Sequence, residues 1–273
     1  MKEFDKVMEA VNFIKKKVDI KPEIGIILGT GLSGLGEKIE NRVVIPYKEI
    51  PYFPISTVES HIGNLVIGTL GGKNVVAMQG RFHLYEGYTS YQVVFPIRVM
   101  KFLGINTLIE SNAAGGLNPF FNKGDIVIIT DHINLTGHNP LIGENDERFG
   151  PRFPDMSSPY SEKLIKIAEE VGIEEKIQLK KGVLVGLLGP NLETRAEYRF
   201  LRLIGADMVT MSTVIEVIAA VHLSLPVLGF SVITDMCLPD ALKPVSFEEI
   251  VEVANSAEPK LTKIVENIII KLI

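Results

Sequence analysis

Three side chains suited to binding an oxyanion lie close together between residues 79 and 88, in the sequence Gln-Gly-Arg-Phe-His-Leu-Tyr-Glu-Gly-Tyr. Arg81, His83 and Tyr85 occupy alternate positions, and the apolar run at 74–78 before them is typical of a buried strand. If the chain stays extended beyond Gln79, all three side chains project from one face, because strand side chains alternate with period 2. The arginine fork matches the geometry of phosphate oxygens. This segment therefore predicts a site for a doubly charged oxyanion beside a polyol.

A glycine-rich loop offers a second place for an anion. The sequence Gly-Thr-Gly-Leu-Ser-Gly at 29–34 follows an apolar run at 24–28 and matches the dinucleotide pattern GxGxxG, with an acid, Glu49, near the expected offset. The next strand-like run begins at Val43, however, and leaves little room for a crossover helix. The favoured alternative is a phosphate cradle in which backbone N–H groups and the Thr30 hydroxyl donate to an anion. A tight turn without any ligand is the third interpretation.

Composition excludes several classes of protein. The chain has 273 residues, of which 46% are hydrophobic and 22% charged, as in ordinary enzymes. Its net charge of −5 argues against a nucleic-acid partner, which normally leaves a basic footprint. A single cysteine, Cys237, excludes an internal disulfide and fits a reducing compartment. We find neither a signal-peptide pattern nor an apolar run long enough to span a membrane. We therefore expect a soluble, cytoplasmic protein with no membrane or nucleic-acid partner.

The elements that must position these residues alternate along the chain. Short runs rich in Val and Ile predict strands at 24–28, 43–47, 64–69, 73–78, 106–111, 125–130, 182–188, 207–211 and 226–233. Helical patterns occur at 3–18, 91–103, 161–171, 194–203 and 213–224. This alternation predicts a single α/β domain over residues 1–273, with a sheet flanked by helices. The early strands follow one another without helices, so we expect the sheet to be mixed.

Two further segments carry specific expectations. The last helical pattern starts at Ser246 with a capping box and runs to Leu272, and Pro259 within it predicts a kink or two abutting helices. Residues 131–160 are rich in Gly, Pro, Asn and Asp and contain no convincing element. A structureless stretch of that length is usually functional, so we expect it to close over a ligand or reach a neighbouring subunit.

Taken together, the ordered motifs resemble those of the trimeric purine nucleoside phosphorylases almost from end to end. They are Gly29-Thr-Gly-Leu32, Ser56-Thr-Val58 with His61, 79–88, Ser111-Asn-Ala-Ala-Gly-Gly-Leu-Asn-Pro119, Asp131-His-Ile-Asn-Leu135, Asn145-Asp-Glu-Arg-Phe-Gly150, Gly189-Pro-Asn-Leu-Glu-Thr194 with Glu197, and Met211-Ser-Thr213. The related methylthioadenosine phosphorylases share the scaffold and many of these motifs.

The resemblance implies phosphorolysis, in which phosphate attacks the anomeric carbon of a purine ribonucleoside such as inosine or guanosine and releases ribose 1-phosphate and the base. Phosphate would be held by Thr30, His61, Arg81, His83, the backbone N–H of Ala113, and Ser212. The nucleoside would contact Tyr85, Asn112, Phe149, Leu192, Glu193, Val209, Met211, Asp235 and Phe247, with His61 also near the sugar. The catalytic residues would be His83, Glu193 and Asp235.

The same resemblance implies a homotrimer in which Phe149 reaches a neighbour's site. No metal or cofactor is expected, since phosphate is a co-substrate and no compact His/Cys/Asp cluster appears in the sequence. The chemistry is coherent: bound phosphate supplies an anion beside an oxocarbenium-like sugar, and hydrogen bonding at N7 absorbs charge on the leaving purine. Ser212 and Thr213 are equally suited to capping the helix at 213–224, Thr213 with Glu216 as a capping box, and capping is compatible with phosphate binding.

Two positions depart from the usual pattern of enzymes for 6-oxopurines. Asp235 stands where these enzymes carry Asn, and an ionised carboxylate only accepts hydrogen bonds. Phe247 stands where a His commonly contacts the ribose 5′-hydroxyl. Both features suit a methylthioadenosine phosphorylase, whereas Glu193, which accepts from N1–H of a 6-oxopurine, favours inosine and guanosine. We predict a purine nucleoside phosphorylase, with a methylthioadenosine phosphorylase as the alternative and a non-catalytic nucleotide-binding module as the rival from another class.

Overall fold

Nine strands form one mixed sheet in the computed structural model, which describes residues 2–29, 33–57 and 62–272. The order is β2-β3-β4-β1-β5-β8-β7-β6-β9, and an additional pairing joins β9 to β5. The strands are β1 (Ile24–Leu28), β2 (Glu40–Pro46), β3 (Asn64–Leu70), β4 (Lys73–Gln79), β5 (Thr107–Gly116), β6 (Ile126–Asn134), β7 (Leu179–Gly186), β8 (Met208–Thr210) and β9 (Val227–Met236).

The sheet has an open part and a closed part. On the open side β2, β3 and β4 pair antiparallel, and β4, β1 and β5 pair parallel. On the other side the pairings β5–β9, β9–β6, β6–β7, β7–β8 and β8–β5 close a ring of five strands. Closure pairs the strand edges that would otherwise be exposed there. Since β5 belongs to both parts, it holds the open side and the ring in one rigid frame.

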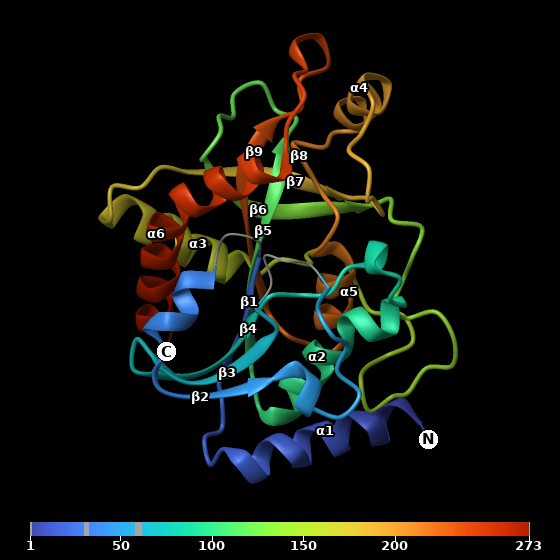
Figure 1. Cartoon of the computed structure of the whole chain (residues 1–273), viewed down its shortest axis with the longest axis vertical. Coiled ribbons are helices and arrows are strands. Elements are labelled where there is room, and N and C mark those ends of the chain that lie inside the picture. The colour runs from blue at the N-terminus through green and yellow to red at the C-terminus, as the bar shows by residue number, and fades with distance from the viewer. Residues whose placement is uncertain (1, 30–32, 58–61, 273) are drawn as a thin grey trace.

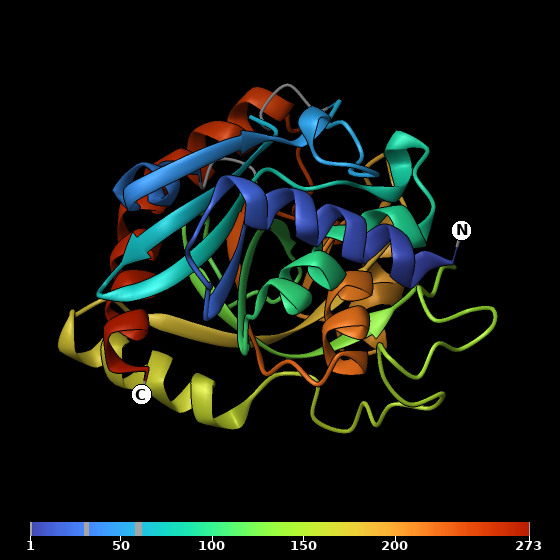
Figure 2. The ribbon, with the colours of Figure 1, turned by 90° about the horizontal axis from the view of Figure 1, so that it is seen from below.

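Helices cover both faces of the sheet (Figures 1 and 2). They are α1 (Glu3–Lys17), α2 (Ser90–Leu103), α3 (Glu162–Glu174), α4 (Arg195–Leu203), α5 (Val214–His222) and α6 (Phe247–Lys271). One core cluster joins α1, α2 and α5 to the sheet, and a second joins α3 and α6 to the opposite face. Adjacent residues of β1 point into different clusters, Ile26 into the second and Ile27 into the first. This explains why β1 reads as a continuous apolar run: parallel strands covered on both faces are hydrophobic throughout.

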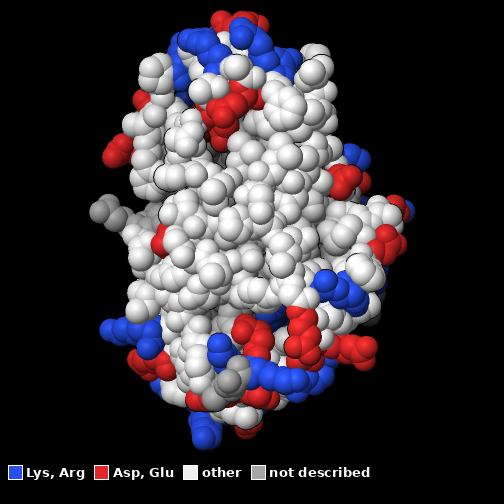
Figure 3. Space-filling model, turned by 90° about the vertical axis from the view of Figure 1, so that its right-hand side faces the viewer, with Lys and Arg blue, Asp and Glu red and all other residues white. Residues whose placement is uncertain are grey.

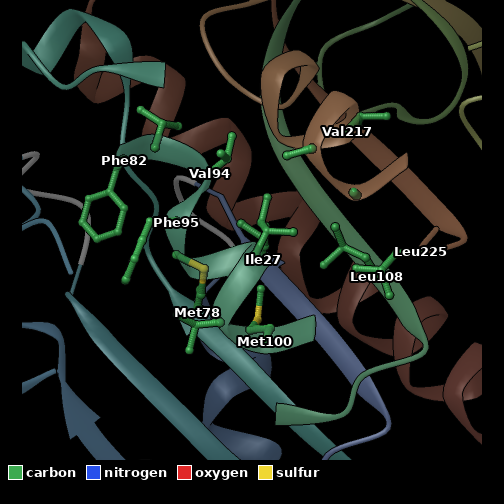
Figure 4. Close-up of a cluster of buried hydrophobic side chains, with 14 of the residues drawn as sticks. Ile27, Met78, Phe82, Val94, Phe95, Met100, Leu108, Val217 and Leu225 are labelled. Carbon is green, nitrogen blue, oxygen red and sulfur yellow. The ribbon is translucent and has the colours of Figure 1, made fainter. Parts of the chain in front are cut away.

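The first cluster lies directly beneath the functional segment. Its side chains converge between the sheet and the two helices α2 and α5 in Figure 4, which labels Ile27, Met78, Phe82, Val94, Phe95, Met100, Leu108, Val217 and Leu225. Phe82 is buried in this cluster and lies between Arg81 and His83 in the chain. The apolar anchor therefore fixes the backbone that carries the two polar side chains.

The α/β architecture with a mixed sheet is confirmed, and each predicted strand is present with boundaries that differ by a few residues. The expectation of two abutting helices at Pro259 is wrong, because α6 continues as one α-helix through this residue; the kink stays a prediction. Proline removes the hydrogen bond to the carbonyl four residues earlier, that of Asn255. Both Pro259 and Asn255 lie on the exposed side of α6, where solvent has access to the helix backbone. No strand or helix occurs between 135 and 161, but the expectation of an irregular stretch from 131 is wrong for its first four residues, which belong to β6.

No helix in the described part of the chain combines the length and the apolar character needed to cross a membrane.

Candidate active site

A cavity of about 300 Å³ opens where β1 and β4 end and where β5, β8 and β9 come together. Crevices at the carboxyl ends of strands are the usual ligand sites of α/β sheets. Most of the predicted site residues line it: Arg81, His83, Tyr85, Asn112, Ala113, Leu192, Glu193, Val209, Met211, Ser212, Asp235 and Phe247. The structure thus brings together residues that are more than 160 positions apart in the sequence.

The segment after β4 reaches the cavity by a different route from the one expected. The strand ends at Gln79, Gly80 adopts a positive φ of 101°, and Tyr85 lies in a 3₁₀ helix, Leu84–Glu86. The expectation of a continued strand is therefore wrong, although Arg81, His83 and Tyr85 all face the same cavity. The rings of His83 and Tyr85 stack, with centroids 4.6 Å apart and an interplanar angle of 14°.

Arg81 is the centre of a buried polar network. Its side chain is 1% exposed and contacts two buried carboxylates, Glu110 at 3.2 Å and Glu216 at 3.3 Å. Its Nη1 also donates to the Ser111 carbonyl at 2.8 Å and to the hydroxyls of Ser212 and Thr213, both at 3.3 Å. The guanidinium therefore orders the hydroxyl groups at this end of the cavity as well as carrying a charge. Among the described residues that line the cavity, Arg81 is the only Lys or Arg.

The surroundings of Glu110 perturb its protonation. Burial raises the pKa of Glu110 well above its ordinary value, and the neighbouring Glu216 raises it further, while Arg81 lowers it. The raised pKa favours the neutral form of Glu110, because burial penalises its charged form.

A strained turn leads from β8 into α5. Thr213 is fully buried and has φ 70° and ψ −55°, and the Val214 N–H donates to the Ser212 carbonyl at 2.7 Å, which makes a γ-turn. This conformation is rare for a β-branched residue and occurs mostly at functional sites. The predicted capping box is present, since the Thr213 N–H donates to Glu216 at 2.6 Å. The turn leaves Ser212 facing the cavity at the start of α5, where the helix terminus favours an anion.

His83 is oriented by a carboxylate that the sequence analysis did not single out. Its Nδ1 lies 3.0 Å from Glu86 Oε1, and the Glu86 side chain also accepts from the backbone of His83 and from Thr57. Burial alone would raise the pKa of Glu86, but these hydrogen bonds outweigh it and lower the pKa to about 2. Ionised Glu86 places the proton of the imidazole on Nδ1 and turns the opposite edge of the ring toward the cavity.

The other end of the cavity carries Glu193 and Asp235 between apolar walls from Leu192, Val209 and Phe247. Burial raises the pKa of Glu193, hydrogen bonds oppose this, and the charge of Asp235 raises it further. Asp235 reaches the cavity through a β-bulge: the register between β5 and β9 shifts after Ala114, so that Thr234 is the extra residue. Bulges re-aim side chains beside sites, and here both Thr234 and Asp235 line the cavity.

The structure does not place every predicted residue at the cavity. Thr30 and His61 lie outside the described residues. Phe149 does not line the cavity of its own chain; its ring is 6% exposed and packs against Phe4, Phe102 and Arg98. In this conformation Phe149 is part of its own subunit's core, and entry into a neighbour's site would require it to leave that cluster.

The dinucleotide interpretation of the glycine loop is wrong. The loop leads into a 3₁₀ helix, Ser33–Lys38, and then into β2, which pairs with β3 and not with β1. A dinucleotide fold needs an α-helical crossover to a parallel neighbour of β1. Gly29 is required for packing, because a Cβ there would lie 2.6 Å from the Ser111 carbonyl oxygen. Gly29 also lines the cavity, as the phosphate-cradle interpretation expects.

Several polar residues of the site were not among those predicted from the sequence. Glu86, Glu110, Tyr198, Thr234 and Cys237 either line the cavity or contact residues that do. Glu110 could have been recognised from the sequence, because a single acidic residue within the predicted strand at 106–111 indicates a buried, paired charge. Nothing in the sequence around Tyr198 or Cys237 indicates a place in the site.

The chain is similar to known proteins over nearly its whole length. The pattern of the phosphorylase superfamily matches residues 23–270. The chain belongs to the phosphorylase superfamily. It is 50% identical to purine nucleoside phosphorylase 1 of Bacillus subtilis, over 97% of this chain and 98% of the relative, and 45% identical to purine nucleoside phosphorylase of Bos taurus, over 96% and 93%.

Solved structures extend this similarity within the superfamily. Isoform 2 of purine nucleoside phosphorylase from Schistosoma mansoni, in complex with cytosine and ribose-1-phosphate, superimposes with a TM-score of 0.95 at 41% identity, covering 99% of this chain and 97% of the other. The Schistosoma mansoni enzyme in complex with adenosine gives a TM-score of 0.94 at 42% identity, covering 98% of each chain. The predicted fold and the predicted purine nucleoside phosphorylase function are confirmed by these similarities.

Proposed function

We propose that this cavity catalyses the phosphorolysis of purine ribonucleosides, with phosphate bound at the Arg81 end and the purine at the Glu193 end. The observation that carries the proposal is the division of one cavity into an end with a cation and hydroxyl groups and an end with two carboxylates. Arg81, Ser212 and the oriented His83 supply donors for phosphate oxygens. Tyr85 and Met211 line the same cavity and supply contacts for the sugar between the two ends.

The arrangement suits the charge that develops during the reaction. Phosphate held beside the sugar stabilises an oxocarbenium-like transition state, and its oxygen attacks the anomeric carbon as the bond to the purine nitrogen breaks. Hydrogen bonds that strengthen as charge builds on the leaving base lower the barrier. His83 positions phosphate, while Glu193 and Asp235 hold the purine ring. Phosphate is the co-substrate, and we assign no metal or cofactor to the reaction.

Glu193 and Asp235 favour different bases. Ionised Glu193 accepts from N1–H of a 6-oxopurine, as in inosine and guanosine, whereas an ionised Asp235 accepts from a 6-amino group. Purine nucleoside phosphorylases of Schistosoma form a complex with adenosine in one structure and with hypoxanthine in another, which supports a site of this shape that admits both kinds of base. We propose inosine and guanosine as the main substrates with tolerance for 6-aminopurines. Phe247, which is apolar where a His is common, keeps the methylthioadenosine alternative open.

We also propose that the enzyme is a cytoplasmic homotrimer. The side of the molecule in Figure 3 has few charged side chains across its middle. The loop at 135–161 lies on this side in Figure 1, and its Phe153 and Ile142 are 87% and 65% exposed. Apolar patches of this kind mark protein interfaces, and closed cyclic symmetry would bury them. Sedimentation at assay concentrations tests this, and a fully active monomer would contradict it.

The reaction itself is tested by measuring hypoxanthine release from inosine with and without inorganic phosphate, together with ribose 1-phosphate. We expect equal amounts of the two products, and no release when phosphate is omitted. Nucleoside binding without a phosphate-dependent product would identify a binding module instead. Methylthioadenosine run in parallel decides the third possibility, because a much higher kcat/KM for it than for inosine would reassign the substrate.

A further inference from the structure

A chain of hydrogen bonds lies behind the purine end of the cavity and involves the single cysteine. The Cys237 thiol donates to Asp235 Oδ2 at 3.1 Å, and the Thr234 hydroxyl donates to Asp235 Oδ1 at 2.9 Å. All three residues are buried and all three line the cavity. Each carboxylate oxygen of Asp235 thus has one protein donor, which fixes the plane of the carboxylate.

The fold places the thiol tightly. The Cys237 N–H donates to the Gly116 carbonyl at 2.8 Å, which continues the β5–β9 pairing past the bulge. A Cβ at Gly115 would lie 2.5 Å from Cys237 Sγ and 3.5 Å from Asp235 Oδ2. Glycine at 115 therefore leaves the space that the thiol occupies, and the thiol has little freedom to turn away from Asp235.

The thiol is suited to act as a donor. Burial raises the pKa of Cys237, and the charge of Asp235 raises it further, so that Sγ keeps its proton. Tyr198 and Glu193 line the same cavity as Cys237 and Asp235, so the thiol belongs to the wall that carries both carboxylates of the purine end.

We propose that Cys237 is a positioning residue that sets the balance between 6-amino and 6-oxo purines by holding Asp235 as a hydrogen-bond acceptor toward the base. This inference rests on the proposed function of the cavity. A carboxylate oxygen has two lone pairs, and the donors behind Asp235 use one on each oxygen. The remaining lone pairs are then available to an exocyclic amino group, which donates. Without the thiol, the carboxylate rotates and this acceptor geometry is lost.

The test compares kcat/KM for adenosine and inosine at saturating phosphate in wild type, Cys237→Ala and Cys237→Ser. We expect Cys237→Ala to lower kcat/KM for adenosine about tenfold, which is the effect of one lost hydrogen bond to a charged group. The same substitution should change kcat/KM for inosine much less. Cys237→Ser keeps a donor and should restore the ratio. In an Asp235→Asn background, Cys237→Ala should leave the ratio unchanged, because the acceptor that it positions is absent.

Three results would overturn the inference. The adenosine-to-inosine ratio of kcat/KM could stay unchanged in Cys237→Ala, or Cys237→Ser could fail to restore it. Cys237→Ala could also change this ratio equally in the Asp235→Asn background. A general packing defect would lower kcat/KM for adenosine and inosine together, and Cys237→Ser would not rescue it. The failure of the proposed function looks different, because wild type would then release no base from either nucleoside in the presence of phosphate.

Discussion

The two ends of the cavity are built differently. At the phosphate end, Arg81, Glu110, Glu216 and Thr213 are almost completely buried. Arg81 alone donates to partners on β5, on the turn at 212–213 and on α5. At the purine end, Asp235 has two donors, and the wall includes Leu192 and Phe247, which are roughly half exposed. Changes at the phosphate end therefore disturb the fold, whereas the purine end can change its preferred base at little structural cost.

The largest effect is expected from Arg81→Ala. Loss of the only described cavity guanidinium should lower kcat/KM for phosphate about a hundredfold or more, the scale of a lost charge-stabilising donor. It should also destabilise the protein by about 3–5 kcal/mol, since Glu216 loses its buried partner. Phosphate titration and thermal unfolding measure the two effects.

A matched control for this prediction is Arg98→Ala. Arg98 is also buried and also paired, with Glu3, but it packs against Phe149 away from the cavity. The Arg98→Ala substitution should lower the stability of the protein and leave the phosphate KM unchanged. An Arg81→Ala enzyme with a normal phosphate requirement would remove Arg81 from the mechanism.

Glu193→Gln should have the next largest effect, confined to 6-oxopurines. Loss of the charged acceptor should lower kcat/KM for inosine about ten- to a hundredfold, as for other hydrogen bonds to charged groups. Because burial raises the pKa of Glu193, the wild-type rate with inosine should fall on the acid side at a pH above the ordinary value of 4.5. The pH profile of Glu193→Gln should lack this fall in rate on the acid side. Glu197→Gln, on the exposed first turn of α4, is the control, and an equal loss there would argue against a specific role for Glu193.

A smaller effect is expected from Glu86→Gln, which releases the His83 ring. The phosphate KM should rise about tenfold, equivalent to one hydrogen bond. The folded pKa of Glu86 is lowered to about 2 from 4.5, so its contribution to stability is fully present above about pH 4.5 and is lost as the pH falls toward 2. The stability difference between variant and wild type, followed by denaturant unfolding, should shrink over that window. A constant difference across it would contradict the assigned ionisation.

The smallest effect is expected from Phe247→His. Phe247 is 49% exposed at the start of α6, so the substitution should not disturb the core. A hydrogen-bonding ring there should raise the ratio of kcat/KM for inosine to that for 5′-deoxyinosine about fivefold, equivalent to roughly 1 kcal/mol. Equal gains for both nucleosides would show that residue 247 does not contact the 5′ position.

Much of this molecule was predictable from the sequence, for identifiable physical reasons. Strands such as β1 and β9 are buried on both faces, so their continuous apolar composition identifies them as strands. The Arg81–Tyr85 segment and the turn at Ser212 are local patterns, and both line the cavity, although the first reaches it through a turn and a 3₁₀ helix and not as a continued strand. The contact of Cys237 with Asp235 was not predictable, because it depends on a one-residue bulge at Thr234 that ordinary strand alternation does not reveal. The pairing of Arg81 with Glu216 spans 135 positions and arises only from the packing of α5 against the sheet.

The independence of the two ends is tested most directly by Asp235→Asn, with phosphate KM and the inosine-to-adenosine ratio of kcat/KM measured on the same preparation. Asparagine can donate to a 6-oxo group and keeps the shape of the residue. We predict that the ratio rises about tenfold or more toward inosine, the scale of one hydrogen bond to a charged group, while the phosphate KM stays at its wild-type value. A phosphate KM that moves in parallel with the ratio would contradict the separation of the two ends.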